Sequence, residues 1–302
     1  MKQKKKIVIT GALGQDGIIL TKKLLKKNFK VYGIIKNDKK IKIKVSNVIY
    51  KKLNLAKFNL LEKYLTKINP DCLIHCGSEN PNFYESNKKK FYKMNFCITK
   101  NLIDFYSKNM KKKKLILIGS SQMYSKKIKK IDLKTPFDPI NLYAKFRSDS
   151  YKYMLKVKKK YKCNIVMAIL FNHDSIYRNK KFLIPRLINM IKNTQFKKLN
   201  LIYRENISGD FSHADDICLG LLKLVNIKRN IDKVIFSSNK RTYINDIIKF
   251  VLKKRKIKKI FNCNSTKYHH GPIGDSAYAK KILNWSPKKN IFIAVDELNR
   301  II

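Results

Sequence analysis

The chain has 302 residues, with 69 Lys and Arg against 20 Asp and Glu, a formal net charge of +49 and a hydrophobic fraction of 44%. This length suits one large domain or two small ones, and the apolar fraction is that of a globular protein. No apolar run approaches the ~20 residues of a membrane span, and Ile7–Thr10 is too short for a signal sequence. These features exclude a membrane protein and a disordered chain, and we expect a cytoplasmic protein.

The lysines occur in short runs along the whole chain, while Gly (10) and Pro (7) are scarce. Such an even spread favours an AT-rich coding sequence over a nucleic-acid-binding face, so we expect no specific nucleic acid and no membrane as partners. The six cysteines form no C-x-x-C pair, and no histidine pair has zinc-ligand spacing. We therefore expect no metal, and buried thiols in a reducing compartment.

Short apolar runs alternate with amphipathic stretches from the N-terminus to Phe171. Six runs have the pattern of buried strands: Ile7–Thr10, Lys30–Ile35, Val48–Lys52, Cys72–Cys76, Leu115–Gly119 and Ile165–Phe171. Four stretches have helical periodicity: Gly17–Lys27, Leu60–Ile68, Phe91–Lys108 and Leu142–Lys160. This alternation predicts an α/β fold with a doubly wound, parallel sheet of the Rossmann type.

Beyond Phe171 the alternation is less regular. The pattern predicts helices over Leu183–Asn193, Tyr243–Lys254 and Ser276–Asn284, and a strand over Lys233–Ser237. We expect a dinucleotide-binding core over 1–172 that continues at about 206–238, and a smaller, discontinuous substrate-binding part made of 173–205 and 239–302.

A glycine-rich turn follows the first predicted strand, with the spacing G-x-x-G-x-x-G. Its first glycine permits the tight turn, its second lets the backbone approach a pyrophosphate, and its third allows close helix–strand packing. Because the turn opens the first helix, the helix N-terminus faces the bound anion. The cofactor-binding residues expected here are Gly11, Leu13, Gly14, Gln15, Asp16 and Gly17.

The end of the second predicted strand indicates which dinucleotide binds. An NAD site usually places a carboxylate there to hold the ribose 2′-hydroxyl. Here the strand is followed by Lys36 and Asn37, with Lys39 and Lys40 nearby. A cationic environment suits a 2′-phosphate, so the sequence favours NADP over NAD.

Seven further segments complete a pattern that runs nearly from end to end. They are Ile74–Ser78, Ser120–Tyr124, Thr135–Pro139, Leu170–Ser175, Gly209–Asp216, Gly274–Asp275 and Leu283–Pro287. Together with Gly11–Gly17, they resemble the extended short-chain dehydrogenase/reductases that modify nucleotide sugars, most of all the GDP-mannose 4,6-dehydratases. The resemblance implies hydride transfer from sugar C4 to the nicotinamide, loss of water across C5 and C6, and return of the hydride to C6.

The resemblance also assigns catalytic positions. Ser120 is the hydroxyl that binds the reacting oxygen, and Tyr143 takes the hydroxyl proton. The activating lysine one helical turn after Tyr143 is Arg147 here, and the glutamate that removes the C5 proton is Gln122. Arginine keeps the charge but differs in shape from lysine, and a neutral amide cannot act as a general base.

The remaining implied positions concern binding. At the cofactor they are Asn54, Leu55, Cys76, Gly77, Ser78, Tyr143, Arg147, His173 and Arg178, in addition to Lys36 and Asn37. At the substrate they are Ser121, Asn172 and Arg186. An arginine that commonly binds the substrate diphosphate is Gly209 here. The implied partners are NADP and a nucleotide-diphosphate sugar, GDP-mannose or a related GDP-sugar, in a homodimer or homotetramer.

Four interpretations stay open at this point. The first is an NADP-dependent dehydratase-like lyase, which we take as the assignment, and the second is a GDP-4-keto-6-deoxymannose reductase-like enzyme, which needs no C5 base. The third is a non-catalytic nucleotide-sugar-binding homologue, suggested by the changes at Gln122, Arg147 and Gly209. The fourth is a nucleic-acid-binding protein, suggested by charge alone. If the chain does dehydrate its substrate, Glu79 and Glu85 are the first alternative bases.

Overall fold

A computed structural model describes residues 3–36, 44–78, 88–261 and 269–302. The chain forms two compact units. The first comprises Met1–Ser125, Pro136–Ile169 and Cys218–Val234, and the second comprises Lys126–Thr135, Leu170–Ile217 and Ile235–Ile302. We describe each by itself.

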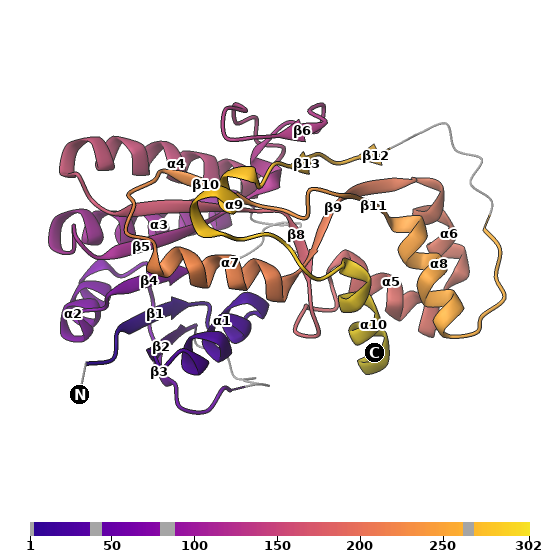
Figure 1. Ribbon diagram of the computed structural model, residues 1–302, viewed down its shortest axis with the longest axis horizontal. Helices are drawn as coiled ribbons and strands as arrows, with labels where there is room; N and C mark the ends of the chain where they lie inside the picture. The colour runs from indigo at the N-terminus through magenta and orange to yellow at the C-terminus, as the bar shows by residue number, and fades with distance from the viewer. Residues whose placement is uncertain (1–2, 37–43, 79–87, 262–268) are drawn as a thin grey trace. The chain divides into compact units, whose positions relative to one another are not determined.

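A parallel sheet forms the centre of the first unit, which confirms the predicted fold class. Its strands are β1 (Lys6–Thr10), β2 (Lys30–Ile35), β3 (Ile49–Lys52), β4 (Cys72–His75), β5 (Lys114–Ser120), β7 (Ile165–Leu170) and β10 (Lys233–Phe236). They lie in the order β10-β7-β5-β4-β1-β2-β3 (Figure 1). The apolar residues of β1, Ile7 to Ile9, are completely buried, because both faces of a parallel sheet are covered by helices.

The helices of this unit are α1 (Gln15–Lys26), α2 (Phe58–Ile68), α3 (Lys88–Asn109), α4 (Leu142–Tyr161) and most of α7 (Ala214–Asn226). The strand order reverses direction at β1, so right-handed crossovers place α1 on the face opposite to α2, α3 and α4. Hydrogen bonds agree with this: Asn109 of α3 reaches Glu62 of α2, and Cys218 of α7 reaches the backbone of Asp16 in α1. The reversal creates the crevice in which α/β sheets bind their ligands.

The second unit combines short strands with helices. They are β6 (Lys130–Ile131), β8 (Asn172–Asp174), α5 (Leu183–Lys192), α6 (Phe196–Arg204), β9 (Ile207–His213), β11 (Arg241–Tyr243), α8 (Ile244–Lys254), β12 (His269–His270), β13 (Ile273–Gly274), α9 (Ala277–Leu283) and α10 (Ile291–Ile301). Strand β9 pairs with β8, β11 and β12. The apolar core lies between α5, α6, α8 and α10, where Ile188, Leu199, Ile247 and Val295 are fully buried.

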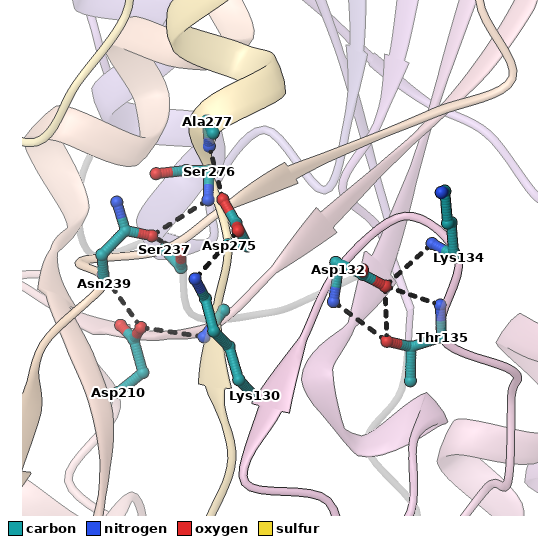
Figure 2. Close-up of polar contacts among 11 residues, drawn as sticks. Lys130, Asp132, Lys134, Thr135, Asp210, Ser237, Asn239, Asp275, Ser276 and Ala277 are labelled. Carbon is teal, nitrogen blue, oxygen red and sulfur yellow. Dashed lines mark hydrogen bonds and ion pairs between the residues drawn. The ribbon is translucent and has the colours of Figure 1, made fainter.

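A buried carboxylate, Asp210 of β9, joins three segments of the second unit (Figure 2). It accepts hydrogen bonds from the backbone of Ser238 (2.7 Å), Asn239 (3.1 Å) and Gly274 (3.2 Å), and from the Ser238 hydroxyl (2.6 Å). The Asn239 side chain extends the network by accepting from the Ser237 hydroxyl and the Ser276 backbone. Burial raises the pKa of Asp210 despite these donors, so its role in the fold is to satisfy buried backbone groups.

The expected and observed elements differ mainly after Phe171. The sequence pattern did not predict α6, β9, α7 or α10. The expected core resumed at about 206, whereas the second unit keeps residues up to Ile217 because β9 pairs only with strands of that unit. It also takes in Lys126–Thr135, because β6 pairs with β13. Across the described ranges, the model has no helix whose length and apolarity would suit a membrane crossing.

We predict that Asp210→Asn destabilises the second unit. The new amide group directs N–H donors at backbone N–H groups, so buried hydrogen bonds are lost at a cost of roughly 2–4 kcal/mol. Urea unfolding followed by tryptophan fluorescence of Trp285 measures this change. The matched control is Asp275→Asn, since Asp275 pairs with an exposed Lys130, and it should cost less than about 1 kcal/mol. Equal losses in the two variants would contradict the assignment.

Candidate functional site

The glycine-rich turn lies between β1 and α1, and its glycines are required by close contacts. Gly11 has a φ of +65°, and a Cβ at this position would lie 2.7 Å from the Gly77 Cα. A Cβ at Gly17 would lie 2.3 Å from the carbonyl oxygen of Gly11. The predicted roles of tight turn and close helix packing thus correspond to specific contacts. Gly77 follows β4, so the ends of β1 and β4 meet here.

The N-terminus of α1 provides an anion-binding surface. Its N-cap is Gly14, which has no side chain to cap the free N–H groups of the first turn. Those groups and the helix dipole favour a phosphate. Of the neighbouring residues predicted to bind the cofactor, Gln15 is buried and its amide donates to Asp16 at 3.2 Å, while Leu13 is partly exposed. The turn therefore has the shape and the donors that a dinucleotide pyrophosphate requires.

A buried histidine lies directly behind this turn. The Nδ1 atom of His75 lies 2.7 Å from the Thr10 hydroxyl, and its Nε2 atom lies 3.3 Å from the Thr99 hydroxyl. The Thr10 oxygen also accepts from the Gly77 backbone N–H at 3.0 Å. Burial, assisted by the charge of Arg147, lowers the pKa of His75 to about 3. The ring is therefore neutral at physiological pH.

Arg147 connects three segments of the first unit around Tyr143. It is buried, and its guanidinium donates to the Ile118 carbonyl in β5, to the Ser78 hydroxyl at 2.9 Å and to the Tyr143 hydroxyl at 2.7 Å. Tyr143 and Arg147 are one turn apart in α4, so their side chains share a face, as the sequence predicted. Arg147 thus fixes the phenol oxygen beside a permanent positive charge.

A small cavity lies next to this guanidinium. Its volume is about 10 Å³, and its lining includes Arg147, His75, Ser78 and Thr99. The Nε atom of Arg147 is buried and has no hydrogen-bond partner among the described residues. The cavity has room for one water molecule, which is the size of group needed to satisfy that donor.

The residue at the position of the family's glutamate is held by a neighbouring amide. Gln122 lies in a 3₁₀ turn (Ser121–Met123) after β5, and its Oε1 accepts from the Asn141 side chain at 2.9 Å. Its backbone N–H donates to the Ser120 hydroxyl at 3.2 Å. Asn141 also caps α4 by accepting from the Ala144 N–H. Gln122 is thus a neutral side chain whose amide oxygen is held in place by Asn141.

The other predicted residues of the first unit lie at the carboxyl ends of its strands. Leu55 is buried after β3, and its carbonyl accepts from Asn101, while Asn54 is exposed and accepts from the Ala56 N–H. Cys76 follows β4, and burial raises the pKa of its thiol. Lys36 is exposed at the end of β2. Ser121 is buried in the 3₁₀ turn. Asn37, Glu79 and Glu85 lie outside the described residues.

Four predicted residues belong to the second unit. Asn172 is exposed on β8, and His173 is buried with Nδ1 at 2.7 Å from the Phe171 carbonyl. Arg178 pairs with the buried Asp174 at 3.0 Å and stacks on the Phe182 ring. Arg186 is exposed on α5. Arg178 is therefore already engaged by an anion, whereas Arg186 lies open to solvent.

The sequence analysis missed three residues that organise the site. Thr10 and His75 form the hydrogen-bonded layer behind the turn, and Asn141 holds Gln122. Asn141 had a detectable signal, because an asparagine directly before a predicted helix is a strong N-cap candidate. His75 had none beyond its place on a buried strand. Within the described ranges, no three His, Cys, Asp or Glu side chains are grouped so as to bind a metal ion.

The family model described as GDP-mannose 4,6 dehydratase matches residues 8–298. The chain belongs to the GDP-mannose 4,6 dehydratase family. It resembles the GDP-mannose 4,6 dehydratase of Dictyostelium discoideum, with 24% identity over 98% of this chain and 95% of that protein. It also resembles GDP-mannose 4,6 dehydratase 1 of Arabidopsis thaliana, with 24% identity over 98% of this chain and 90% of that protein.

Solved structures share the fold of this GDP-mannose 4,6 dehydratase family member. The dTDP-glucose 4,6-dehydratase of Bacillus anthracis, in complex with NAD, has a TM-score of 0.82 at 16% identity and covers 98% of this chain and 96% of its own. The UDP-glucose 4-epimerase of Thermotoga maritima, with UDP-glucose, has a TM-score of 0.83 at 14% identity. The match covers 98% of this chain and 97% of the epimerase chain. Both share the overall fold of this chain at low sequence identity.

We predict that His75 makes stability depend on acid pH. Its pKa is about 3 in the folded chain but about 6.5 when unfolded, so the unfolded state binds more protons as pH falls below 6.5. The free energy of unfolding should therefore drop by up to about 1.4 kcal/mol per pH unit between those values. Urea unfolding at pH 7 and pH 4.5 measures it, with His75→Asn as the comparison. The drop should be smaller in the variant, and an equal drop would contradict a neutral His75.

Proposed function

We propose that this protein is a nicotinamide-dinucleotide-dependent enzyme acting on a nucleotide-diphosphate sugar, GDP-mannose or a related GDP-sugar, and that it carries out the redox step at C4 far better than the dehydration. The observation that carries the proposal is the contrast between the two halves of the site. The Tyr143–Arg147–Ser78 group is complete and hydrogen-bonded. The position of the C5 base holds a neutral amide.

The cofactor part rests on the turn between β1 and α1. Gly11 and Gly17 allow the tight turn and the close approach of backbone segments, and the N-terminus of α1 has no side-chain cap for its N–H donors. When bound, the dinucleotide supplies the acceptor for a hydride. Two of the solved relatives are described as bound to NAD, which supports this class of cofactor.

The proton-transfer part rests on Tyr143, Ser120 and Arg147. Tyr143 in its phenolate form would accept the C4 hydroxyl proton, and the bound dinucleotide would supply the acceptor for the C4 hydride. Arg147 donates to the phenol oxygen of the half-buried Tyr143 and so stabilises negative charge on it. The Ser120 hydroxyl accepts from the Gln122 N–H, which leaves its own proton to donate to the sugar oxygen.

The dehydration part lacks its base. Gln122 accepts from Asn141 through Oε1 and has no basic electron pair of carboxylate strength. Losing a general base typically costs ~10²–10⁴ in rate, or roughly 3–5 kcal/mol. This observation favours a second candidate, a reductase-like enzyme on the same scaffold. Such an enzyme needs Tyr143, Ser120 and the cofactor but removes no C5 proton.

The deciding experiment incubates the pure protein with GDP-mannose and NADP and, separately, with NAD. Mass spectrometry then separates a product lighter by two hydrogens from one lighter by water. The proposal expects the oxidised, undehydrated sugar with reduced cofactor. Dehydration at an ordinary enzyme rate, near ~10 s⁻¹, would overturn the base assignment and direct attention to Glu79 and Glu85. Binding of GDP-mannose without any turnover would favour the non-catalytic nucleotide-sugar-binding homologue, and absence of both binding and turnover would contradict the proposed function.

We predict that Gln122→Glu raises dehydration by at least ~10²-fold. The carboxylate keeps the shape of the amide, accepts from Asn141 and supplies the missing base. Exchange of the sugar C5 proton with deuterated solvent, followed by NMR, measures the base directly. The matched control is Gln195→Glu, the same change at the exposed residue before α6, which should leave the rate unchanged. No gain in C5 exchange would show that Gln122 does not face C5.

We predict that the protein binds NADP more tightly than NAD. The reason is that the residue directly after β2 is the exposed Lys36 and not a carboxylate. Lys36→Glu should reverse the preference by about tenfold, or ~1.4 kcal/mol. Titration calorimetry with both cofactors measures it, and Lys26→Glu, an exposed lysine in α1, is the control for net charge. NAD binding tenfold tighter to the unaltered chain would contradict the prediction.

A further inference from the structure

We propose that His75 is a positioning residue of the glycine-rich turn between β1 and α1. Its Nδ1 atom accepts a hydrogen bond from the Thr10 hydroxyl, which orients the Thr10 oxygen to accept from the Gly77 N–H. This pair of hydrogen bonds holds the ends of β1 and β4 together. The proposal rests on the proposed function in that the bound molecule is a nicotinamide dinucleotide.

The direction of the hydrogen bonds follows from the partners at each end. The Thr99 hydroxyl donates to the Asn95 carbonyl at 2.9 Å, so its oxygen accepts from His75 Nε2–H at 3.3 Å. The ring is then protonated on Nε2, and Nδ1 is an acceptor. Thr10 accordingly donates to Nδ1 at 2.7 Å and accepts from the Gly77 N–H at 3.0 Å. Every donor in this chain has one acceptor.

The last bond of the chain lies where the backbone is most crowded. A Cβ at Gly11 would be 2.7 Å from the Gly77 Cα, and a Cβ at Gly77 would be 3.0 Å from the Gly11 nitrogen. Thr10 and His75 are register partners in the β1–β4 pair. The Thr10–Gly77 hydrogen bond therefore continues the pairing of β1 and β4 beyond their last residues, directly beside the first glycine of the turn.

The environment keeps His75 in the required neutral form. A protonated ring has two donors, so Thr10 would have to accept from both Nδ1–H and the Gly77 N–H and its own proton would lose its acceptor. The charged group that faces the ring is Arg147 of α4, whose positive charge opposes protonation. The arginine that holds Tyr143 thus also keeps the histidine behind the turn in its acceptor form.

Two pairs of variants separate positioning from packing. His75→Asn places an amide oxygen near the former Nδ1, on the Thr10 side, whereas His75→Gln carries its amide to the Thr99 side. Thr10→Val and Thr99→Val remove one hydroxyl each, at opposite ends of the ring. Each pair loses similar buried volume and hydrogen bonds, so a merely structural role predicts similar effects within a pair. Melting temperatures of all four variants record the loss of stability.

The first readout is the Kd for NADP and NAD. We expect His75→Gln and Thr10→Val to weaken binding about tenfold, and His75→Asn and Thr99→Val to change it less than threefold. The second readout is hydrogen exchange of the Gly77 amide without cofactor, which we expect to accelerate about tenfold in His75→Gln and Thr10→Val alone. Thr10→Ser keeps the hydroxyl and should restore both values.

Equal effects within the pairs, in Kd or in Gly77 exchange, would overturn the proposal and leave His75 as a packing residue. If the unaltered protein binds neither dinucleotide, the proposed function fails. The exchange of the Gly77 amide still decides whether His75 holds the turn, because that measurement needs no cofactor. The two failures are therefore distinguishable.

Discussion

The buried guanidinium of Arg147 is the interaction on which the site of the first unit depends. A buried charge costs several kcal/mol unless its donors are satisfied. Arg147 meets this requirement with neutral groups: a backbone carbonyl of β5, the hydroxyl of Ser78 after β4 and the phenol of Tyr143 in α4. No carboxylate pairs with it among the described residues. The charge is therefore uncompensated until an anion binds or a proton leaves the site.

This uncompensated charge explains the character of the groups around it. The pKa of His75 lies far below its ordinary value, because burial and the arginine both oppose a second positive charge. The α1 N-terminus adds a further positive potential. A pyrophosphate and a developing negative charge on Tyr143 are the species that such a site stabilises.

Local patterns predicted the parts of the site that are contiguous in sequence. The spacing of Gly11, Gly14 and Gly17 is sufficient to place a phosphate turn, and the four-residue step from Tyr143 to Arg147 places both on one helical face. The contact of Gly11 with Gly77 and the Asn141–Gln122 pair join distant segments. Without an alignment or a structure, nothing in either segment points to the other.

The second half of the chain was harder to predict for a different reason. Strand β9 contains Ser208, Gly209, Asp210 and Ser212, so it shows no apolar alternation, although its residues from Ser208 onward are buried. Its burial depends on Asp210, whose carboxylate satisfies backbone donors from two other segments. Helix α7 begins at Ala214, directly after the last residue of β9, so the sequence pattern shows no boundary between the strand and the helix. Such polar buried strands are specified by tertiary hydrogen bonds, which periodicity does not register.

The substitutions at the family's catalytic positions leave an ordered site. An amide at position 122 is hydrogen-bonded to Asn141, and the arginine at position 147 makes three hydrogen bonds. Its remaining Nε is buried without a partner among the described residues, and Arg147 lines a cavity with room for one water. An unsatisfied buried polar group costs ~1–3 kcal/mol, so these hydrogen bonds stabilise the fold around both substituted positions. The arrangement around Arg147 fixes Tyr143 through the same guanidinium that holds Ser78, and Ser78 directly follows Gly77 at the glycine-rich turn.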